Sequence, residues 1–298
     1  MQGAIRFGCV ACGLLALTTA ALGQVSVELS PIKDNTLYQV SPGATATSNG
    51  AGQHFFIGKT IQSSLRRGLM QFNFSSIPQN ATILEVTLTL HCSRSAIAGT
   101  EDLKMHRVLA NWGQGTSNAN TNEGQGATAT SGDATWFNRI HPVTGWLQAG
   151  GQFVATPSLT KPIGNVDFYD LQSEGLAADV QYWLANPNNN FGWILRGNED
   201  AAATAKRFDT RENPDVAVRP YLTVIYTTGP VCDSIDFNND NSFFDPQDIE
   251  ALLSVYSEGP CVPASATCND IDFNNDESVF DPQDIDAFLS VFSEGPCL

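Results

Sequence analysis

Basic residues are absent from the end of the chain. Residues 229–298 contain 15 Asp and Glu residues and no Lys or Arg, whereas residues 24–228 contain 14 basic and 16 acidic residues. Proteins grip nucleic acid with Lys and Arg that neutralise phosphates, so we expect no nucleic-acid partner for this segment. So dense a negative charge repels itself unless a counter-charge is bound. The segment is therefore expected either to bind cations or to form a disordered acidic tail.

Long apolar runs are also absent, with one exception near the N-terminus. Phe7–Leu22 follows the single charge of Arg6 and ends in small residues at Ala21-Leu22-Gly23. This pattern is typical of a signal peptide, here residues 1–23, with cleavage expected before Gln24. A retained anchor is the alternative, but the run is short and rich in small residues for a membrane span. We predict a secreted, extracellular protein without a membrane span, which could stay associated with the cell surface.

Recognisable catalytic motifs are absent as well. The four histidines, at positions 54, 91, 106 and 141, show no metal-ligand spacing, and there is no Gly-x-Ser-x-Gly elbow, His-Glu-x-x-His motif or P-loop. The two facing carboxylates of a glycosidase, or the Tyr with Arg or His of a lyase, are defined by geometry that a sequence does not show. We predict a non-catalytic protein, with a polysaccharide lyase or glycosidase as an alternative.

The acidic segment is an internal repeat. Cys232–Cys261 recurs 36 residues later as Cys268–Cys297, and both units open with Asp-x-Asn-x-Asp. Alternating oxygen-bearing side chains on a tight loop suit a hard cation such as calcium. The acid that closes each loop stands at the thirteenth position instead of the usual twelfth, which one extra residue near Asn241 would explain. Asn241 and Glu277 stand where such loops usually carry Gly; Asn tolerates a left-handed turn, whereas Glu does so poorly.

These loops are predicted to bind two calcium ions. Each loop would supply five side chains and one backbone carbonyl. The expected ligands are Asp236, Asn238, Asp240, the Phe243 carbonyl, Asp245 and Asp248 in the first loop, and Asp272, Asn274, Asp276, the Val279 carbonyl, Asp281 and Asp284 in the second.

A short helix is predicted after each loop. Asp245-Pro246-Gln247-Asp248 places Asp at an N-cap, Pro at the first helical position and an acid at the third. Apolar residues then follow at helical spacing until Gly259-Pro260 ends the helix, and the second unit repeats the pattern. The predicted apolar faces are Ile249, Leu252, Leu253 and Tyr256, and Ile285, Phe288, Leu289 and Phe292.

In these features residues 231–298 resemble a dockerin, a duplicated calcium-loop-and-helix module that binds cohesin domains. They are most similar to a cysteine-flanked, GC-type variant whose units end in Ser-x-Gly-Pro-Cys. The resemblance implies an EF-hand-like α-helical module with a cohesin-like or other cell-surface receptor. The thirteenth-position acid, the missing Gly and the flanking cysteines depart from the usual dockerin pattern.

The cysteines are expected to form disulfides. The four at Cys232, Cys261, Cys268 and Cys297 allow three pairings. Because the members of each unit are 29 residues apart, we predict Cys232–Cys261 and Cys268–Cys297, which would close two identical units. A zinc site is the alternative, although its cysteine pairs would be two to four residues apart. Cys92 alternates with apolar residues along a strand pattern and is predicted to be a buried free thiol.

Residues 24–228 are predicted to be mainly β. Alternating or β-branched runs bounded by Gly, Pro and Asn occur at Val25–Leu29, Gly68–Phe74, Thr82–Cys92, Leu103–Leu109, Phe191–Arg196 and Tyr221–Tyr226. One helix is expected near Ser173–Ala185, with Leu176, Val180, Trp183 and Leu184 on one face. Many strands and one helix favour an antiparallel β-sandwich of the jelly-roll type. The long Gly- and Asn-rich segment 111–151 is predicted to be functional or disordered.

This part of the chain resembles the DNRLRE family of secreted β-sandwiches, related to carbohydrate-binding module family 96. The matching stretches are Pro31–Tyr38, Arg66–Phe72, Asn80–Leu90, Arg107–Trp112, Phe208–Glu212 and Pro220–Val224. The family's letters map onto Asp34, Arg67, Leu69, Arg211 and Glu212, with Asn49 as a candidate for its Asn. The resemblance implies a non-catalytic sugar-binding or structural module that occurs beside polysaccharide-degrading enzymes.

Four residues are predicted to contact a glycan. Strand alternation is expected to turn Arg67, Arg207 and Arg211 away from the core, where they could clamp carboxylates or sulfates of an acidic polysaccharide. Trp136 could stack on a sugar ring, although tryptophans are mostly buried and could pin the long segment to the core. Structural ion pairs are the alternative for Arg211 and Glu212. We therefore predict a carbohydrate-binding or matrix protein displayed through its tail, with a purely structural surface protein as the alternative.

Overall fold

The computed structural model describes residues 24–229, 232–276, 278–279, 281–293 and 297. The predicted signal peptide lies outside the described residues. Among the residues described, none of the helices is long and apolar enough to cross a membrane.

Eleven antiparallel strands form one curled sheet that makes up most of the fold. Along its main path the strand order is β1-β15-β6-β14-β4-β5-β13-β7-β11, while β12 pairs with β6 and β2 pairs with β5. The bounds are β1 (Gln24–Leu29), β2 (Pro31–Tyr38), β4 (His54–Lys59), β5 (Leu65–Phe72), β6 (Ala81–Ser95), β7 (Glu101–Arg107), β11 (Leu159–Ile163), β12 (Asp167–Gln172), β13 (Trp193–Arg196), β14 (Lys206–Asp209) and β15 (Tyr221–Thr228).

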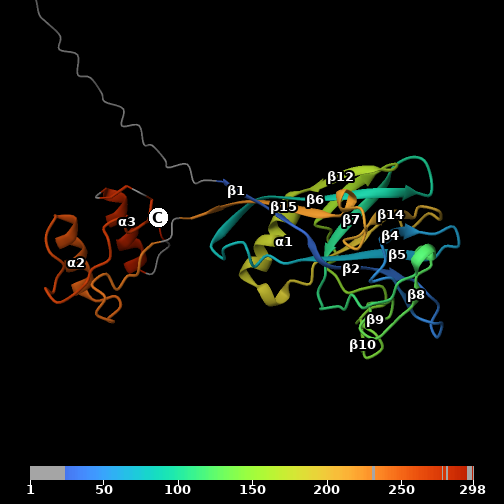
Figure 1. Cartoon of the computed structure of the whole chain (residues 1–298), viewed down its shortest axis with the longest axis horizontal. Coiled ribbons are helices and arrows are strands. Elements are labelled where there is room, and N and C mark those ends of the chain that lie inside the picture. The colour runs from blue at the N-terminus through green and yellow to red at the C-terminus, as the bar shows by residue number, and fades with distance from the viewer. Residues whose placement is uncertain (1–23, 230–231, 277, 280, 294–296, 298) are drawn as a thin grey trace, which may run out of the picture.

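The sheet folds over on itself because β4 pairs with β14 through one stretch and with β5 through another. In Figure 1, β6, β12 and β15 lie in one layer and β2 and β5 in the other. The main apolar cluster joins both layers, since it combines side chains of β6 and β15 with side chains of β5, β7 and β13. Alternation puts every second side chain of these strands into this core. The prediction of a mainly β, antiparallel fold is confirmed.

Strand β6 shows where simple alternation fails. Val86, Leu88, Leu90 and Cys92 are buried as predicted, but Leu84 is 45% exposed. The register against β15 shifts between Ile225 and Tyr226, so one residue of β6 is left over at this point. A bulge of this kind reverses which side chains face the core. Cys92 is buried and is not part of a disulfide, as predicted.

The predicted helix is α1 (Glu174–Ala185). Ser173 caps it, because its hydroxyl accepts the N–H of Leu176 at 3.2 Å. The four residues predicted to form its apolar face, Leu176, Val180, Trp183 and Leu184, are all buried against the sheet.

The long segment between β7 and β11 forms a second apolar cluster against β2, β5 and β13. Trp112, Trp136 and Trp146 are all buried in it. Within it are one 3-10 turn, η1 (Asn120–Asn122), and a short pair of strands, β9 (Asn138–Ile140) with β10 (Thr144–Gly145). Its strand β8 (Ala127–Thr128) pairs with β3 (Thr47–Ser48), which lies earlier in the chain. The segment is therefore ordered and packed on the sheet.

Helices α2 (Pro246–Tyr256) and α3 (Pro282–Phe292) follow the two acidic loops. They share a third apolar cluster, in which Phe237, Leu252, Phe273 and Phe288 are almost fully buried. Both start as predicted, with Asp at the N-cap, Pro at the first position and a capping box closed by the third residue. Leu253 and Leu289 were predicted to be core residues but are 50% and 46% exposed. Ala251 and Ala287 are buried in their place.

Because the third cluster draws all of its described members from residues 232–292, residues 24–228 should fold without the tail. All five tryptophans lie before residue 229, so tryptophan fluorescence reports on this part alone. We expect a chain ending at Thr228 to melt in one cooperative step, within about 2 °C of the full-length protein. Loss of the cooperative transition, or a much larger drop in melting temperature, would show that the tail contributes to the core of the sheet.

Candidate functional site

The first acidic loop is wound around the carboxylate of Asp236. Its two oxygens accept the backbone N–H groups of Asp240 at 3.0 Å and Asn241 at 2.9 Å. The amide oxygen of Asn238 also accepts the N–H of Asp240, at 3.0 Å. Asn241 has φ of 70°, the left-handed conformation predicted for this position. Three of the predicted ligand residues thus shape one tight turn.

The second loop repeats these contacts. Asp276 donates its N–H to Asp272 at 2.9 Å and to Asn274 at 3.2 Å. Glu277, the residue predicted to fit this turn poorly, lies outside the described residues. The side chains of Phe243 and Val279 are exposed, and the proposed role of their carbonyls stays a prediction.

The acid at the thirteenth position faces back into each loop. Asp248 is fully buried, and its oxygens accept the N–H of Asn238 at 3.5 Å and of Asp245 at 3.3 Å. Burial raises the pKa of Asp248. The side chain of Asp245 points to the helix, where it accepts the N–H groups of Gln247 and Asp248 as the N-cap. Asp245 is therefore engaged as a cap in the structure.

Asp284 is the equivalent of Asp248 and is also fully buried. Burial raises its pKa, and the neighbouring charges of Asp281 and Asp272 raise it further. Its Oδ1 atom has no hydrogen-bond partner within the described part of the chain. A buried carboxylate oxygen without a partner is costly unless a proton or a cation is bound to it.

The two units are joined by reciprocal hydrogen bonds. The N–H of Asp233 donates to the Phe273 carbonyl at 2.8 Å, and the N–H of Asn269 donates to the Phe237 carbonyl at 2.9 Å. Asp233 and Asn269 occupy equivalent positions in the two units, and so do Phe237 and Phe273. The contact is therefore pseudo-twofold symmetric, and each loop is braced by the other.

The disulfides follow the same symmetry, and the predicted pairing within each unit is wrong. The structure joins Cys232 to Cys297 and Cys261 to Cys268, each with Cα atoms 5.6 Å apart. Each bond links the start of one unit to the end of the other. Because the units pack around a pseudo-twofold axis, the ends of different units meet, whereas the two ends of one unit do not.

In the described ranges, no three His, Cys, Asp or Glu side chains come together closely enough to hold a metal ion. In each loop one of the predicted ligand side chains, Asp245 or Asp281, caps the following helix and is therefore not gathered with the other acids. Calcium also accepts amide and carbonyl oxygens as ligands, so a calcium site does not need three acids.

In the sheet, Arg67 is not available to a glycan. It forms a two-point ion pair with Glu199, at 2.7 and 2.9 Å, and donates to the Gly150 carbonyl at 2.7 Å. Its guanidinium lies 4.9 Å from the ring centre of Trp136. Burial raises the pKa of Glu199, but the hydrogen bonds from Arg67 and Arg196 outweigh this and lower the pKa to about 2. Trp136 is only 7% exposed, so it pins the long segment to the sheet instead of offering an open ring face.

Arg207 and Arg211 also have partners. Arg207 donates to the hydroxyl of Ser93 at 3.0 Å. Arg211 lies 2.8 Å from Glu212, the structural ion pair that was the alternative to glycan binding. Among the described contacts none joins Arg207 or Arg211 to the group around Arg67, and the role of the three arginines in glycan binding stays a prediction.

The ion pair of Arg211 belongs to a buried junction with the long segment. Asp34 is fully buried and accepts the N–H of Arg211 at 3.1 Å, while Gln114 donates to Glu212 at 2.8 Å. Burial and the charge of Glu212 together raise the pKa of Asp34 well above its usual value. Two carboxyls and one guanidinium are balanced when a single proton is bound between the acids.

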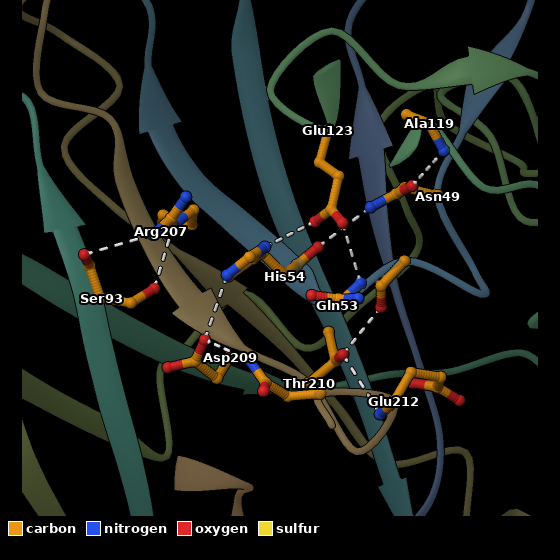
Figure 2. Close-up of polar contacts among 12 residues, drawn as sticks. Asn49, Gln53, His54, Ser93, Ala119, Glu123, Arg207, Asp209, Thr210 and Glu212 are labelled. Carbon is orange, nitrogen blue, oxygen red and sulfur yellow. Dashed lines mark hydrogen bonds and ion pairs between the residues drawn. The ribbon is translucent and has the colours of Figure 1, made fainter. Parts of the chain in front are cut away.

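A second junction, around His54, was not predicted from the sequence (Figure 2). The two ring nitrogens of His54 face two acids, Glu123 at 2.7 Å and Asp209 at 3.2 Å. Asp209 also contacts His91, at 2.6 Å. Glu123 comes from the long segment, whereas His54, His91 and Asp209 come from neighbouring strands of the sheet. No sequence motif marks this group, because its members are separated by about 30 residues or more along the chain.

Since carboxylates only accept hydrogen bonds, His54 donates from both nitrogens when it is protonated. Burial lowers the pKa of His54, but the hydrogen bonds to Asp209 and Glu123 outweigh this and raise it. Asn49 adds to the junction, because its side chain accepts the N–H of Ala119 and donates to the carbonyl of His54. The long segment is thus held to the sheet at two junctions, one through Gln114 and one through Glu123.

A scan against protein-family models found no match to this chain, and a search of curated proteins also found none.

The disulfide pairing can be tested by paired Cys→Ser variants. In the chain-entropy model, the bond that closes the longer loop, Cys232–Cys297, stabilises the fold by about 4 kcal/mol, and Cys261–Cys268 by about 2.5 kcal/mol. C232S/C297S should therefore destabilise the tail more than C261S/C268S, measured by urea unfolding of helicity. Peptide mapping without reduction should recover the same two pairs. A Cys232–Cys261 peptide would contradict the pseudo-twofold arrangement.

The His54 junction predicts a pH dependence. The pKa of His54 is raised in the folded state, so its stabilisation is complete below about pH 6.5 and is lost as the pH rises through the folded-state value. H54Q should flatten this decline in melting temperature between about pH 6 and 8, followed by tryptophan fluorescence. H141Q, which removes a histidine outside both junctions, should leave it unchanged. An equal slope in H54Q and the parent protein would exclude His54 as the titrating group.

Proposed function

We propose that this chain is a secreted, non-catalytic protein in which a calcium-binding tail displays a β-sandwich module that binds extracellular carbohydrate. The observation that carries the tail's part of the proposal is the pair of equivalent loops. Each is wound on an Asp carboxylate, and each is closed by a fully buried acid, with no Lys or Arg in the segment to balance the charge.

The loop residues fit a calcium ion in their chemistry. Each loop has hard oxygen donors from carboxylates and one amide, which calcium prefers. Buried Asp284, whose Oδ1 has no close hydrogen-bond partner within the described structure, is a place where a bound cation would be stabilising. Asp236, Asn238, Asp240 and Asp248 would hold the first ion, and Asp272, Asn274, Asp276 and Asp284 the second. The side chains of Asp245 and Asp281 would bind these ions only if they continued to cap helices α2 and α3 at the same time.

When bound, calcium supplies the counter-charge that the sequence of the tail lacks. Two like charges about 4 Å apart repel by about 1 kcal/mol in bulk water and by more where they are partly buried. Helices of eleven residues are marginal on their own, so α2 and α3 cannot offset such repulsion in each loop without packing. The ions would therefore order the loops and, through the shared apolar cluster, the helices.

The tail would act as an attachment module of the dockerin-like kind. Leu253 and Leu289 support this, because they are exposed, apolar and at equivalent positions of the two units. A receptor of the cohesin-like or cell-surface class would bury them. The pseudo-twofold axis would present nearly the same surface in two orientations.

The β-sandwich, of a jelly-roll type as in the DNRLRE family, would be a binding module without catalysis. His54 itself is not available as a base for a substrate, because its two nitrogens both face carboxylates. The engaged arginines favour a second candidate, a purely structural surface protein. Retention on immobilised polysaccharide separates the two, because only the binding module is retained.

The calcium proposal is tested by the double variant D236A/D272A. In the parent protein, calcium at 100 times the dissociation constant should stabilise the tail by about 2.7 kcal/mol per site and increase its helicity. Magnesium, which demands a tighter octahedral shell, should do so less. The double variant should lose the response in calcium-dependent circular dichroism and melting.

A matched control removes the same number of acids elsewhere. Glu250 and Asp286 are exposed, occupy equivalent positions on α2 and α3, and lie outside the loops. E250A/D286A should retain the full calcium response. If calcium has no effect on the parent, or if both double variants respond alike, the loops are not calcium sites.

A further inference from the structure

A pocket of about 260 Å³ lies between the C-terminal half of α1 and the segment that follows β5. Its walls are apolar and its remaining lining groups are amides and a hydroxyl. The lining residues are Phe74, Ile77, Trp183, Leu184 and Pro187, with Asn73, Ser75, Gln79 and Asn190. None of these described residues is charged. Such a lining suits an uncharged ligand with both apolar and hydroxyl groups.

Trp183 lines the pocket and carries a hydrogen-bond donor that is unused within the described structure. Its side chain is 1% exposed and is stacked on Phe74, with ring centres 5.8 Å apart and planes 18° apart. Its indole N–H has no hydrogen-bond partner among the residues that the structure describes. A buried indole N–H usually finds a partner, and leaving it without one costs free energy. A ligand oxygen that enters the pocket would supply that partner.

The polar groups at the rim differ in how many hydrogen bonds they already form within the protein. Asn190 is fixed, because it donates to the Phe72 carbonyl at 2.8 Å and accepts the N–H of Gly192 at 3.2 Å. Asn73 uses its oxygen to accept the N–H of Ser75, so its NH₂ group is left for a ligand. Gln79 is exposed and forms no hydrogen bond within the described residues. The rim thus offers amide donors and an acceptor over an apolar floor.

We propose that this pocket binds one uncharged sugar residue of an extracellular glycan. The inference rests on the proposed function and names the site and the class of sugar. The volume is slightly below the range of about 300–1,000 Å³ for pockets of drug-sized ligands, so one ring fits and an extended chain does not. Its C–H groups lie on Phe74, Leu184 and Pro187, one oxygen accepts from Trp183, and Asn73 and Gln79 bind other hydroxyls.

A second, more strongly polar pocket of the sheet favours this choice by contrast. It is lined by charged residues of both signs, including Glu101, Asp102, Lys104 and Arg196. There Glu199 is already neutralised by Arg67 and Arg196. Uronic acids would need a free cation, and the Trp183 pocket provides none in the described structure.

The test is calorimetric binding to the full-length protein. The probes are uncharged β-1,4-linked hexasaccharides of glucose, mannose and xylose, with a hexasaccharide of mannuronic acid for comparison. At least one uncharged probe should bind more tightly than the uronate. W183F, which keeps a ring but removes the N–H, should weaken that binding by about three- to tenfold, the range for one hydrogen bond.

Because W183F alters a packed side chain, rim variants provide the second measurement. S75Y should block the pocket and abolish binding, whereas S76Y, at the adjacent exposed residue that does not line the pocket, should not. Q79A should weaken binding and N80A should not. Glycan binding that is unaffected by S75Y and Q79A, or that prefers the uronate, overturns the pocket proposal and leaves the carbohydrate-binding function standing. Failure of every probe, together with no retention on polysaccharide, overturns both.

Discussion

Buried carboxylates need hydrogen bonds, a proton or a positive partner, and this requirement organises both parts of the protein. In the sheet, Asp209 is paired with His54 and His91, and Glu199 is paired with two arginines. The first pairs join neighbouring strands, the Glu199 pairs attach the 197–204 region, and the contact of His54 with Glu123 attaches the long segment. In the tail, Asp248 and Asp284 are buried just as deeply, but the sequence after Arg219 contains no Lys, Arg or His. Under the proposed function a positive partner comes from solution, and calcium is the cation that suits these oxygens.

The same requirement explains why Arg67 and Arg211, two of the arginines expected to bind glycans, are paired with carboxylates. Strand alternation correctly placed Arg67 and Arg207 away from the main core. It could not show that the long segment folds back over that face and brings Gly150 and Trp136 onto Arg67. Such contacts between distant segments depend on tertiary packing, which one sequence without its relatives does not reveal. The neutral pocket beside Trp183 was invisible for the same reason.

Local features were predictable where a short stretch of sequence decides the structure. The Asp-Pro starts of α2 and α3, the Ser173 cap and the left-handed Asn241 all follow from the chemistry of a few adjacent residues. The exposed Leu84 follows from a bulge set by the partner strand, and the disulfide pairing from the symmetry of the two units. Equal spacing of the cysteines fits pairing within units and between units alike. The packing of the repeats decides between them.

A tail that orders only with calcium would restrict attachment of the module to calcium-rich surroundings, as in extracellular fluids. The most direct test of this account is the number of calcium ions bound per chain, measured by equilibrium dialysis of the full-length protein. The account predicts two ions per chain, and one ion after D284N, which removes the charge from the unpartnered buried acid. No bound calcium at millimolar concentration, or an unchanged count in D284N, would contradict it.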